Sequence, residues 1–330
     1  MMLRGRIGWV VLGIVLVAGV CARLLMSRGL DGVLTFGWSS DAAAWRLGAV
    51  ASAVVAGAAL SLSGLLLQGM LRNPLASPFV LGLSGGAQAA VAIATLVAWK
   101  AGGSLPVGAQ AAVGAVGAAA ALGVCIAFGR ARGGEIDPVG LVLAGVVVAA
   151  MAGSVASLCE WLLPPADRSA LAAWGFGRVP EMPDRALLGS VLAAVSVTVL
   201  AGLSVWRHLD AMQLGDDEAR SLGVPLVGAR WMVVLVSSVL AAVATALCGP
   251  LAFVGLVGPH AARALVGGSH RNSVMGAALA GAALLCLADA ARALVPVDGG
   301  RLPVGVICAL AGGPAFLVLL RRGAAGVWKP

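Results

Sequence analysis

The sequence predicts an all-α polytopic membrane protein, and three observations carry this prediction. Of the 330 residues, 60% are hydrophobic and only 11% are charged, against about 25% charged residues in an average globular chain. The mean hydropathy is +1.01. The charged residues are also clustered, and windows such as 101–128 contain none. Because a transmembrane helix needs about 20 apolar residues, these windows exclude a disordered chain, a disulfide scaffold and a large soluble catalytic domain.

The charge balance and the reactive residues exclude several functions. The net charge of +8 is better explained by basic loops facing anionic lipid than by nucleic-acid binding. The only lysines, Lys100 and Lys329, are followed by Ala101 and Pro330, so the chain has no GK[ST] phosphate-binding loop. The six cysteines lie in apolar stretches without CxxC spacing, and the three histidines are scattered. We therefore expect no catalytic residues, no metal site and no resident cofactor.

The first apolar stretch resembles a secretion signal, because Arg4 and Arg6 precede an apolar run over 7–21. No A-x-A cleavage site follows it. We therefore expect a retained first helix.

Charge-poor windows bounded by loop residues then predict ten helices. The uncharged stretch 231–262 is too long for one helix, and Gly249-Pro250 is its natural break because proline cannot continue the hydrogen-bonded helix. The predicted spans lie near 7–26, 47–70, 78–98, 106–128, 139–160, 186–206, 231–249, 251–267, 273–290 and 303–320.

Ten spans in a single permease domain, residues 1–330, place both termini on one side of the membrane. With the termini cytoplasmic, thirteen Lys and Arg residues fall on that side and nine on the other, which agrees with the positive-inside rule. The segment 207–230 is then the only long polar loop in the cytoplasm. Glycine and proline spacings also suggest an inverted repeat of helices 2–5 and 7–10, because Gly64 lies ten residues before Pro74 and Gly249 ten before Pro259.

An ordered set of motifs covers roughly residues 45–322. It comprises Gly57-Ala58-Ala59-Leu60-Ser61-Leu62-Ser63-Gly64, Arg72-Asn73-Pro74-Leu75-Ala76, Gly82-Leu83-Ser84-Gly85-Gly86, Leu143-Ala144-Gly145, Leu214-Gly215-Asp216-Asp217-Glu218-Ala219-Arg220, Phe253-Val254-Gly255-Leu256-Val257-Gly258-Pro259-His260 and Leu302-Pro303-Val304-Gly305. This set resembles the FecCD family, the permease subunits of ABC importers for iron–siderophore complexes, heme and vitamin B12.

The resemblance implies a BtuC-like permease of a type II ABC importer in the inner (cytoplasmic) membrane. It would pair with a second copy of itself or with a paralogous permease, around a path along the dimer axis. A cytoplasmic ABC ATPase dimer, which carries the ATP and Mg²⁺, would dock beneath it, and a periplasmic substrate-binding protein would deliver the substrate. Membrane lipid is the remaining partner, and no nucleic acid is expected.

The polar loop aligns with the coupling segment of the family. Acidic residues at its start and a glycine at its end favour a short helix, which the resemblance assigns to the ATPase contact; a solvated loop is the alternative. The candidate coupling residues are Leu214, Gly215, Asp216, Asp217, Glu218, Ala219, Arg220, Leu222 and Gly223.

Basic residues on the outer side align with the docking residues of the family, namely Arg46 and Arg292. The sequence Arg46-Leu47-Gly48-Ala49 lacks the second arginine of the family motif, and Arg301 stands where the family has an acidic residue. Arg301 is thus a third docking candidate. The alternative for Arg292 is an internal ion pair with Asp289, three residues earlier.

The candidate pathway and gate residues are Gln68, Asn73, Pro74, Pro138, Val139, Pro259 and His260. For the polar members Gln68, Asn73 and His260 the first expectation is structural, namely to satisfy backbone groups freed near the two prolines, and bordering the pathway is the alternative. Pro138 and Val139 align with the cytoplasmic gate of the family, where uncharged residues suit closure by packing.

The predicted function is translocation of an iron chelate, foremost a ferric siderophore, with heme or vitamin B12 as alternatives. An ion-coupled secondary transporter is a remote alternative, because such proteins normally carry an ionisable residue in the middle of a span and the predicted span centres hold no acid.

Overall fold

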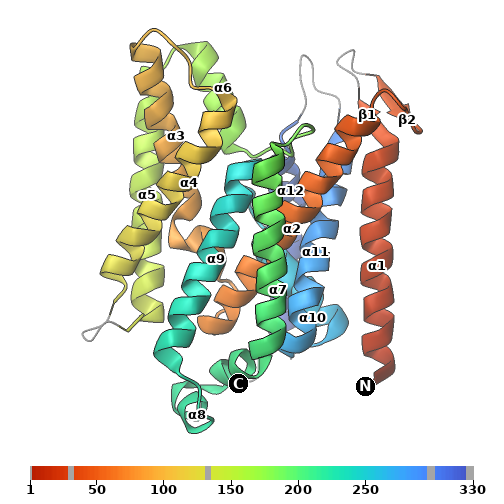
Figure 1. Cartoon of the computed structure of the whole chain (residues 1–330), viewed down its shortest axis with the longest axis vertical. Helices are drawn as coiled ribbons and strands as arrows, with labels where there is room; N and C mark the ends of the chain where they lie inside the picture. Colours follow the sequence, from red (N-terminus) through yellow and green to blue (C-terminus); the bar gives the residue numbers. More distant parts are fainter. Residues whose placement is uncertain (1, 29–32, 131–134, 296–301, 325–330) are drawn as a thin grey trace.

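The computed structural model describes residues 2–28, 33–130, 135–295 and 302–324. It is a bundle of helices with a small antiparallel hairpin of β1 (Met26–Arg28) and β2 (Leu34–Phe36) (Figure 1). The helices are α1 (Met2–Leu25), α2 (Ala43–Met70), η1 (Pro78–Leu81), α3 (Leu83–Lys100), α4 (Val107–Phe128), α5 (Pro138–Leu162), α6 (Pro165–Gly175), α7 (Arg185–Leu214), α8 (Asp216–Ser221), α9 (Leu226–Cys248), α10 (Val254–Val266), α11 (His270–Ala291), η2 (Arg292–Leu294) and α12 (Val304–Ala324).

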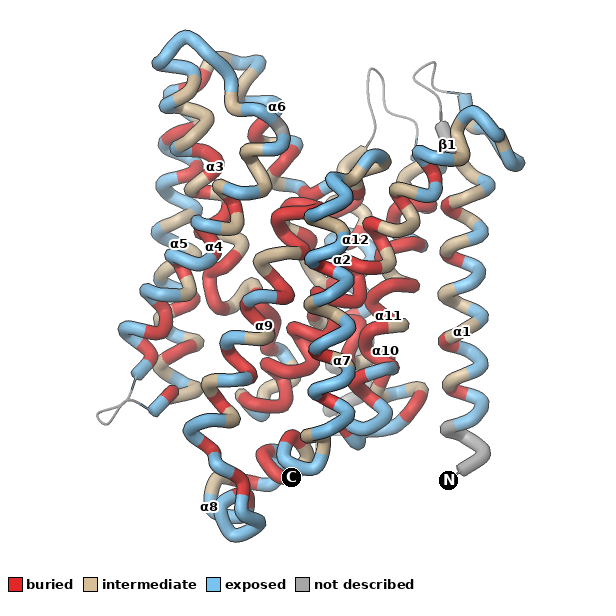
Figure 2. The backbone as a smooth tube through the Cα atoms, in the orientation of Figure 1, coloured by how far each residue is buried: buried red, intermediate tan, exposed pale blue. Residues whose placement is uncertain are grey.

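Helix α2 is the centre of the bundle. Its most apolar window is 83% buried, against 22% for α1 and for α5, and it packs against α7, α9, α10 and α11. The burial pattern in Figure 2 shows the same contrast between a buried centre and exposed outer helices. Small residues make this possible, because helix backbones approach closely where Gly, Ala and Ser replace larger side chains.

Two glycine contacts show how close the backbones lie. A Cβ added at Gly57 of α2 would lie 2.3 Å from the carbonyl oxygen of Gly281 in α11, and one added at Gly281 would lie 2.1 Å from that of Gly57. Likewise, a Cβ at Gly64 would lie 1.6 Å from the carbonyl oxygen of Gly255 in α10. That carbonyl is four residues before Pro259, which has no N–H to bond it. Gly64 therefore leaves the space that the freed carbonyl occupies.

Each of the ten predicted spans overlaps a helix of the structure. Seven of the described helices are long and apolar enough to cross a membrane, and these are α1, α2, α4, α5, α7, α9 and α11. Helix α10 has 13 residues and α3 has 18, and the apolar part of α12 is short. A mostly helical fold with several apolar helices of membrane-spanning length is thus confirmed, whereas the count of ten spans stays a prediction.

The structure differs from the prediction at four places, the first of which is the hairpin of β1 and β2. The span 78–98 is divided into η1 and α3 by Gly82, whose φ of +71° is left-handed. Helix α6 was not predicted, since it is short and only weakly apolar. The loop 207–230 is mostly helical, because α7 continues to Leu214 and α9 begins at Leu226.

The inverted repeat stays a prediction, and the proline spacing that suggested it does not match the local structure. Pro74 lies in the loop after α2, whereas Pro259 lies inside α10. A different correspondence is present: Gly82 and Phe253 are both left-handed residues that cap the N-termini of α3 and α10. Each lies against a Leu-Ala-Gly triplet, that of Gly145 in α5 and that of Gly312 in α12.

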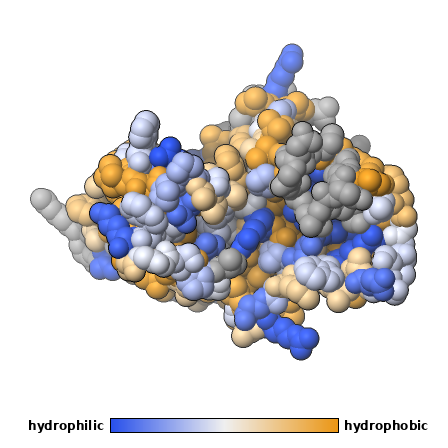
Figure 3. Space-filling view, turned by 90° about the horizontal axis from the view of Figure 1, so that it is seen from above, coloured by the Kyte–Doolittle hydropathy of each residue, from blue (hydrophilic) through white to orange (hydrophobic). Residues whose placement is uncertain are grey.

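The bundle has two ends, which we name after the short helices that mark them. The α8 end carries the start of α1 and the protruding helix α8 (Figure 1). The α6 end carries the hairpin and α6, and hydrophilic side chains are spread over its surface (Figure 3). In the predicted orientation the α8 end is cytoplasmic.

Candidate functional site

Helix α8 projects from the end of the bundle and presents a mixed surface. Leu214 and Leu222, which flank it, are 66% and 62% exposed, while Ala219 is fully buried and fixes the inner side of the helix. Asp217 is exposed, and its one ion pair among the described residues is with Arg220, at 3.3 Å on the same helix. Gly215 and Gly223 have φ angles of +143° and +81°, which glycine adopts without strain. The predicted short helix is confirmed.

Asp216 fastens α8 to two other helices. One carboxylate oxygen lies 3.0 Å from the Arg72 guanidinium, just after α2, and the other lies 2.6 Å from that of Arg230 in α9. Arg230 is buried, whereas Arg72 is partly exposed. Asp216 therefore has a structural role, and the exposed acids available for an outside contact are Asp217 and Glu218. The sequence did not predict either ion pair: Arg72 is 144 residues from Asp216, and Arg230, 14 residues after it, carries no signal of the contact.

A second connection at the α8 end joins α7 to α11. The Asp210 carboxylate accepts hydrogen bonds from the backbone N–H of His270 at 2.8 Å and from Ser269 Oγ at 3.0 Å, and His270 Nδ1 lies 2.7 Å from it. Because the carboxylate only accepts, Nδ1 carries the proton. The imidazole is buried against Gly69 of α2, where a Cβ would lie 2.9 Å from Nε2. A negative charge at this helix N-terminus is also favourable for the helix dipole.

At the α6 end, a network of two arginines and two acids connects distant parts of the chain. Asp289 of α11 pairs with Arg23 of α1 and, at 2.6 Å, with Arg292 of η2. Glu181, in the segment before α7, lies 2.9 Å from Arg23 and 3.6 Å from Arg292. All four side chains are at most 20% exposed. The internal alternative predicted for Arg292 is thus present in the structure, with Arg23 and Glu181 as members that the sequence did not indicate.

Two of the three predicted docking arginines, Arg46 and Arg292, are largely buried. Arg46 is 4% exposed, and its guanidinium donates hydrogen bonds of 2.6 Å to the carbonyl oxygens of Leu24 and Gly37. It thereby holds the end of α1 and the hairpin against α2. Arg292 is occupied in the network, and Arg301 lies outside the described residues. Docking by Arg46 and Arg292 remains a prediction without support from this geometry, because a buried and paired charge is not offered to a partner.

The polar residues between α2 and α10 are engaged inside the bundle. Arg263 of α10 donates a hydrogen bond to Gln68 of α2. His260 Nδ1 lies 2.7 Å from the carbonyl oxygen of Leu256, and its ring meets Phe316 of α12 edge-on, with centroids 5.5 Å apart. Arg263 was not among the predicted residues. The structural role expected first for Gln68 and His260 fits these contacts, although His260 bonds Leu256 and not the carbonyl that Pro259 frees.

The remaining pathway candidates lie at helix ends and in a turn. Asn73 Oδ1 accepts a hydrogen bond from the N–H of Leu75 at 2.9 Å and so closes the turn that contains Pro74. Pro138 is the first residue of α5, capped by Asp137, whose carboxylate accepts from the N–H groups of Val139 and Gly140. Val139 is 66% exposed. Their assignment to a gate stays a prediction.

No group of metal-ligating residues was found in the described part of the chain. The six cysteines are free thiols, and five of them are buried. Among the described residues, the candidate functional features are therefore the ion pairs at both ends of the apolar bundle and the exposed helix α8 at one end.

Comparison with known proteins gives one family. The model of the FecCD transport family matches residues 9–322. The hemin transport system permease protein HmuU of Yersinia pestis is 36% identical over 280 residues, which cover 84% of this chain and 82% of that protein. The ferric enterobactin permease FepD of Escherichia coli is 36% identical over 85% of this chain and 82% of its own length. The Fe(3+) dicitrate permease FecD of the same organism is 33% identical over 84% of each chain.

Solved structures support the fold. A metal-chelate-type ABC transporter in an inward-facing conformation has a TM-score of 0.78 at 24% identity, and the match covers 94% of this chain and 97% of that one. The PsaBC complex of Streptococcus pneumoniae is more distant, with a TM-score of 0.54 at 14% identity, over 83% of this chain and 90% of that one.

Proposed function

The chain belongs to the FecCD transport family, and we propose that it is the permease subunit of an inner-membrane ABC importer that carries an iron chelate, foremost a ferric siderophore. The named relatives support this substrate class, because they include permeases for ferric enterobactin and Fe(3+) dicitrate. The hemin permease, which is equally identical at 36%, supports heme as the second candidate.

The observation that carries the proposal is the geometry of α8. A short helix stands beyond the ends of α7 and α9 (Figure 1), with leucines and acids exposed around it and with Asp216 bound to the body of the bundle. Exposed leucines flanked by charges suit a protein contact with an apolar centre and a polar rim. We assign this contact to a separate ABC ATPase dimer, which would hold the ATP and Mg²⁺.

The other partners follow from the same proposal. The functional unit would contain two permeases, either two copies of this chain or this chain with a paralogue. A periplasmic binding protein would dock on the α6 end, and both termini would lie in the cytoplasm with α8. In this arrangement substrate selection falls mainly to the binding protein, and this chain provides the path and the contact with the ATPase.

Growth of a deletion strain tests the substrate. We expect the strain to lose growth under iron limitation with a ferric siderophore as the iron source, and expression of the chain to restore it. Growth with hemin and growth that depends on cobalamin are the parallel arms. If the strain loses growth only with hemin as the iron source, the substrate is heme and not a ferric siderophore.

Uptake measurements test the energy source. Uptake of the iron-55 siderophore should stop when cellular ATP is depleted and should persist when a protonophore collapses the proton gradient. Uptake that follows the proton gradient instead would show an ion-coupled transporter and refute the ABC assignment.

A further inference from the structure

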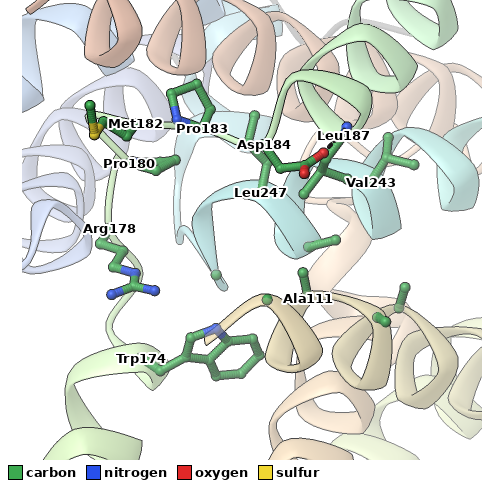
Figure 4. A pocket seen from close by; sticks show the side chains of 15 residues that line it. Ala111, Trp174, Arg178, Pro180, Met182, Pro183, Asp184, Leu187, Val243 and Leu247 are labelled. Carbon is green, nitrogen blue, oxygen red and sulfur yellow. Dashed lines mark hydrogen bonds between the residues drawn. The ribbon is translucent and has the colours of Figure 1, made fainter. Parts of the chain in front are cut away.

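A cavity of about 610 Å³ lies at the α6 end, between α4, α7, α9 and the segment 178–184 (Figure 4). Helices α4 and α7 both pack against α9, and Figure 1 shows α9 in the interval between them. The cavity therefore lies on a flank of the bundle beside α9, and we take this flank to face lipid. Its lining on α4 runs from Gly108 to Ala115, which corresponds to a depth of about 10 Å at 1.5 Å per residue.

The inner walls of the cavity are apolar and made of small or aliphatic side chains. They include Ala111 and Ala115 on α4 and Val243 and Leu247 on α9. The indole of Trp174, at the end of α6, forms a further wall (Figure 4). Apolar walls at this depth suit hydrocarbon, and tryptophan is the residue most typical of the boundary between hydrocarbon and headgroups.

Two opposite charges face this apolar space. The side chain of Arg178 points into the cavity from one side, and the carboxylate of Asp184 points into it from another (Figure 4). Among the described residues, no carboxylate pairs with the Arg178 guanidinium. One oxygen of Asp184 accepts a hydrogen bond from the N–H of Leu187 at 2.8 Å, and the second oxygen has no protein donor in the described structure. Both side chains are therefore available to a ligand.

We propose that this cavity binds a zwitterionic phospholipid of the phosphatidylethanolamine type. The phosphate is recognised by Arg178, because a guanidinium is a fork of donors that matches phosphate oxygens. The ammonium group is recognised by Asp184, and the acyl chains leave the cavity between α4 and α7. An anionic lipid such as phosphatidylglycerol carries the same phosphate for Arg178 but has no ammonium group to pair with Asp184. Opposite charges on the two sides of the cavity thus favour a headgroup that carries both signs.

Native mass spectrometry of the purified full chain in detergent, titrated with phosphatidylethanolamine or phosphatidylglycerol, tests the proposal. The wild type should bind one phosphatidylethanolamine more tightly than phosphatidylglycerol. Arg178→Gln should weaken phosphatidylethanolamine binding about tenfold, as loss of a charged hydrogen bond predicts. Arg185→Gln is the matched control, because Arg185 is exposed and begins α7 but does not line the cavity. Its affinity should stay within about twofold of the wild type.

Two further variants separate the headgroup from the cavity. Asp184→Asn keeps a residue that caps helix N-termini well and removes the negative charge, so it should abolish the preference over phosphatidylglycerol. A change of preference cannot result from misfolding.

Ala111→Phe should block binding of both lipids by filling the cavity, while Val116→Phe, on an exposed part of α4, should not. Equal binding of the two lipids by the wild type, or phosphatidylethanolamine binding unchanged in both Arg178→Gln and Ala111→Phe, would overturn the proposal.

Discussion

At the residue scale, neighbouring acids in α8 have opposite surroundings. Asp216 is held between Arg72 and Arg230, whereas Asp217 is 96% exposed and has one weak partner on its own helix. Ion pairs between exposed side chains contribute little to stability, but a partner removed from a buried charge leaves that charge uncompensated. Substitutions at Asp216 therefore test the stability of α8, and substitutions at Asp217 test its contact with a partner.

Asp216→Asn should lower the free energy of unfolding by about 1–3 kcal/mol, because it leaves the buried Arg230 guanidinium without a carboxylate. Asp217→Asn should change it by less than about 0.5 kcal/mol. Thermal unfolding of the purified chain in detergent measures both. Equal effects of the two substitutions would contradict the anchoring role of Asp216.

The four-residue network at the α6 end depends on its most buried member. Asp289→Asn removes the one carboxylate that touches both Arg23 and Arg292 closely, and we expect a loss of about 3–5 kcal/mol, the usual cost of breaking a buried pair. Asp41→Asn, at an exposed position of the same end, is the control and should be nearly neutral. A small effect of Asp289→Asn in the same unfolding assay would show that Glu181 alone neutralises the two arginines.

At the element scale, the contact between α2 and α10 depends on a glycine and a proline on different helices. Pro259 frees the carbonyl of Gly255, and Gly64 gives that carbonyl room. The sequence indicated both residues but not their relation, because glycine and proline on separate helices carry no signal of contact. The backbone of Phe253 is left-handed, with a φ of +65°. The sequence could not predict this either, because non-glycine residues rarely adopt this conformation.

Gly64→Ala should force α2 and α10 apart, because its Cβ would lie 1.6 Å from a backbone oxygen that cannot turn away. We expect a marked loss of folded protein and of thermal stability. Gly13→Ala is the matched control: it lies within α1 with open space around the added Cβ, and alanine is the better helix former by about 1 kcal/mol. Equal stability of both variants would disprove the close contact.

The helices themselves were largely predictable, because an apolar window bounded by charges or by Gly-Pro marks a helix in a membrane protein. The windows 106–128 and 139–160 differ from α4 and α5 by one or two residues. The long-range ion pairs were not predictable. Arg23 and Asp289 are 266 residues apart, and only the packing of α1 against α11 brings them together. The α8 acids were identified by their resemblance to a family, which did not tell Asp216 from Asp217.

At the scale of the whole molecule, the proposed function divides the work of transport between this chain and its partners. The described residues hold no group of metal ligands, and the sequence contains no phosphate-binding lysine motif. In the proposed function, the energy for transport comes from a separate ATPase.

Reconstitution tests this division of labour. Proteoliposomes with the chain alone should neither hydrolyse ATP nor accumulate substrate, while addition of the ATPase and the binding protein should give ATP-dependent uptake. In the complete system Asp217→Lys should lower uptake severalfold per ATP hydrolysed without affecting folding, because it reverses an exposed charge on the proposed contact surface. Uphill transport by the chain alone would refute the proposal.

The two arginines that pair with Asp216 differ in how far their side chains are exposed. We expect this difference to decide which of the two ion pairs breaks first when α8 is displaced. The Arg72 side chain is 41% exposed and that of Arg230 is 8% exposed, so dissolved salt screens the first attraction far more than the second. Under a sideways force the bridge to Arg72 is the one that opens, and the bridge to Arg230 holds. We therefore expect a displacement of α8 to move α9 first, and to move the turn after α2 less.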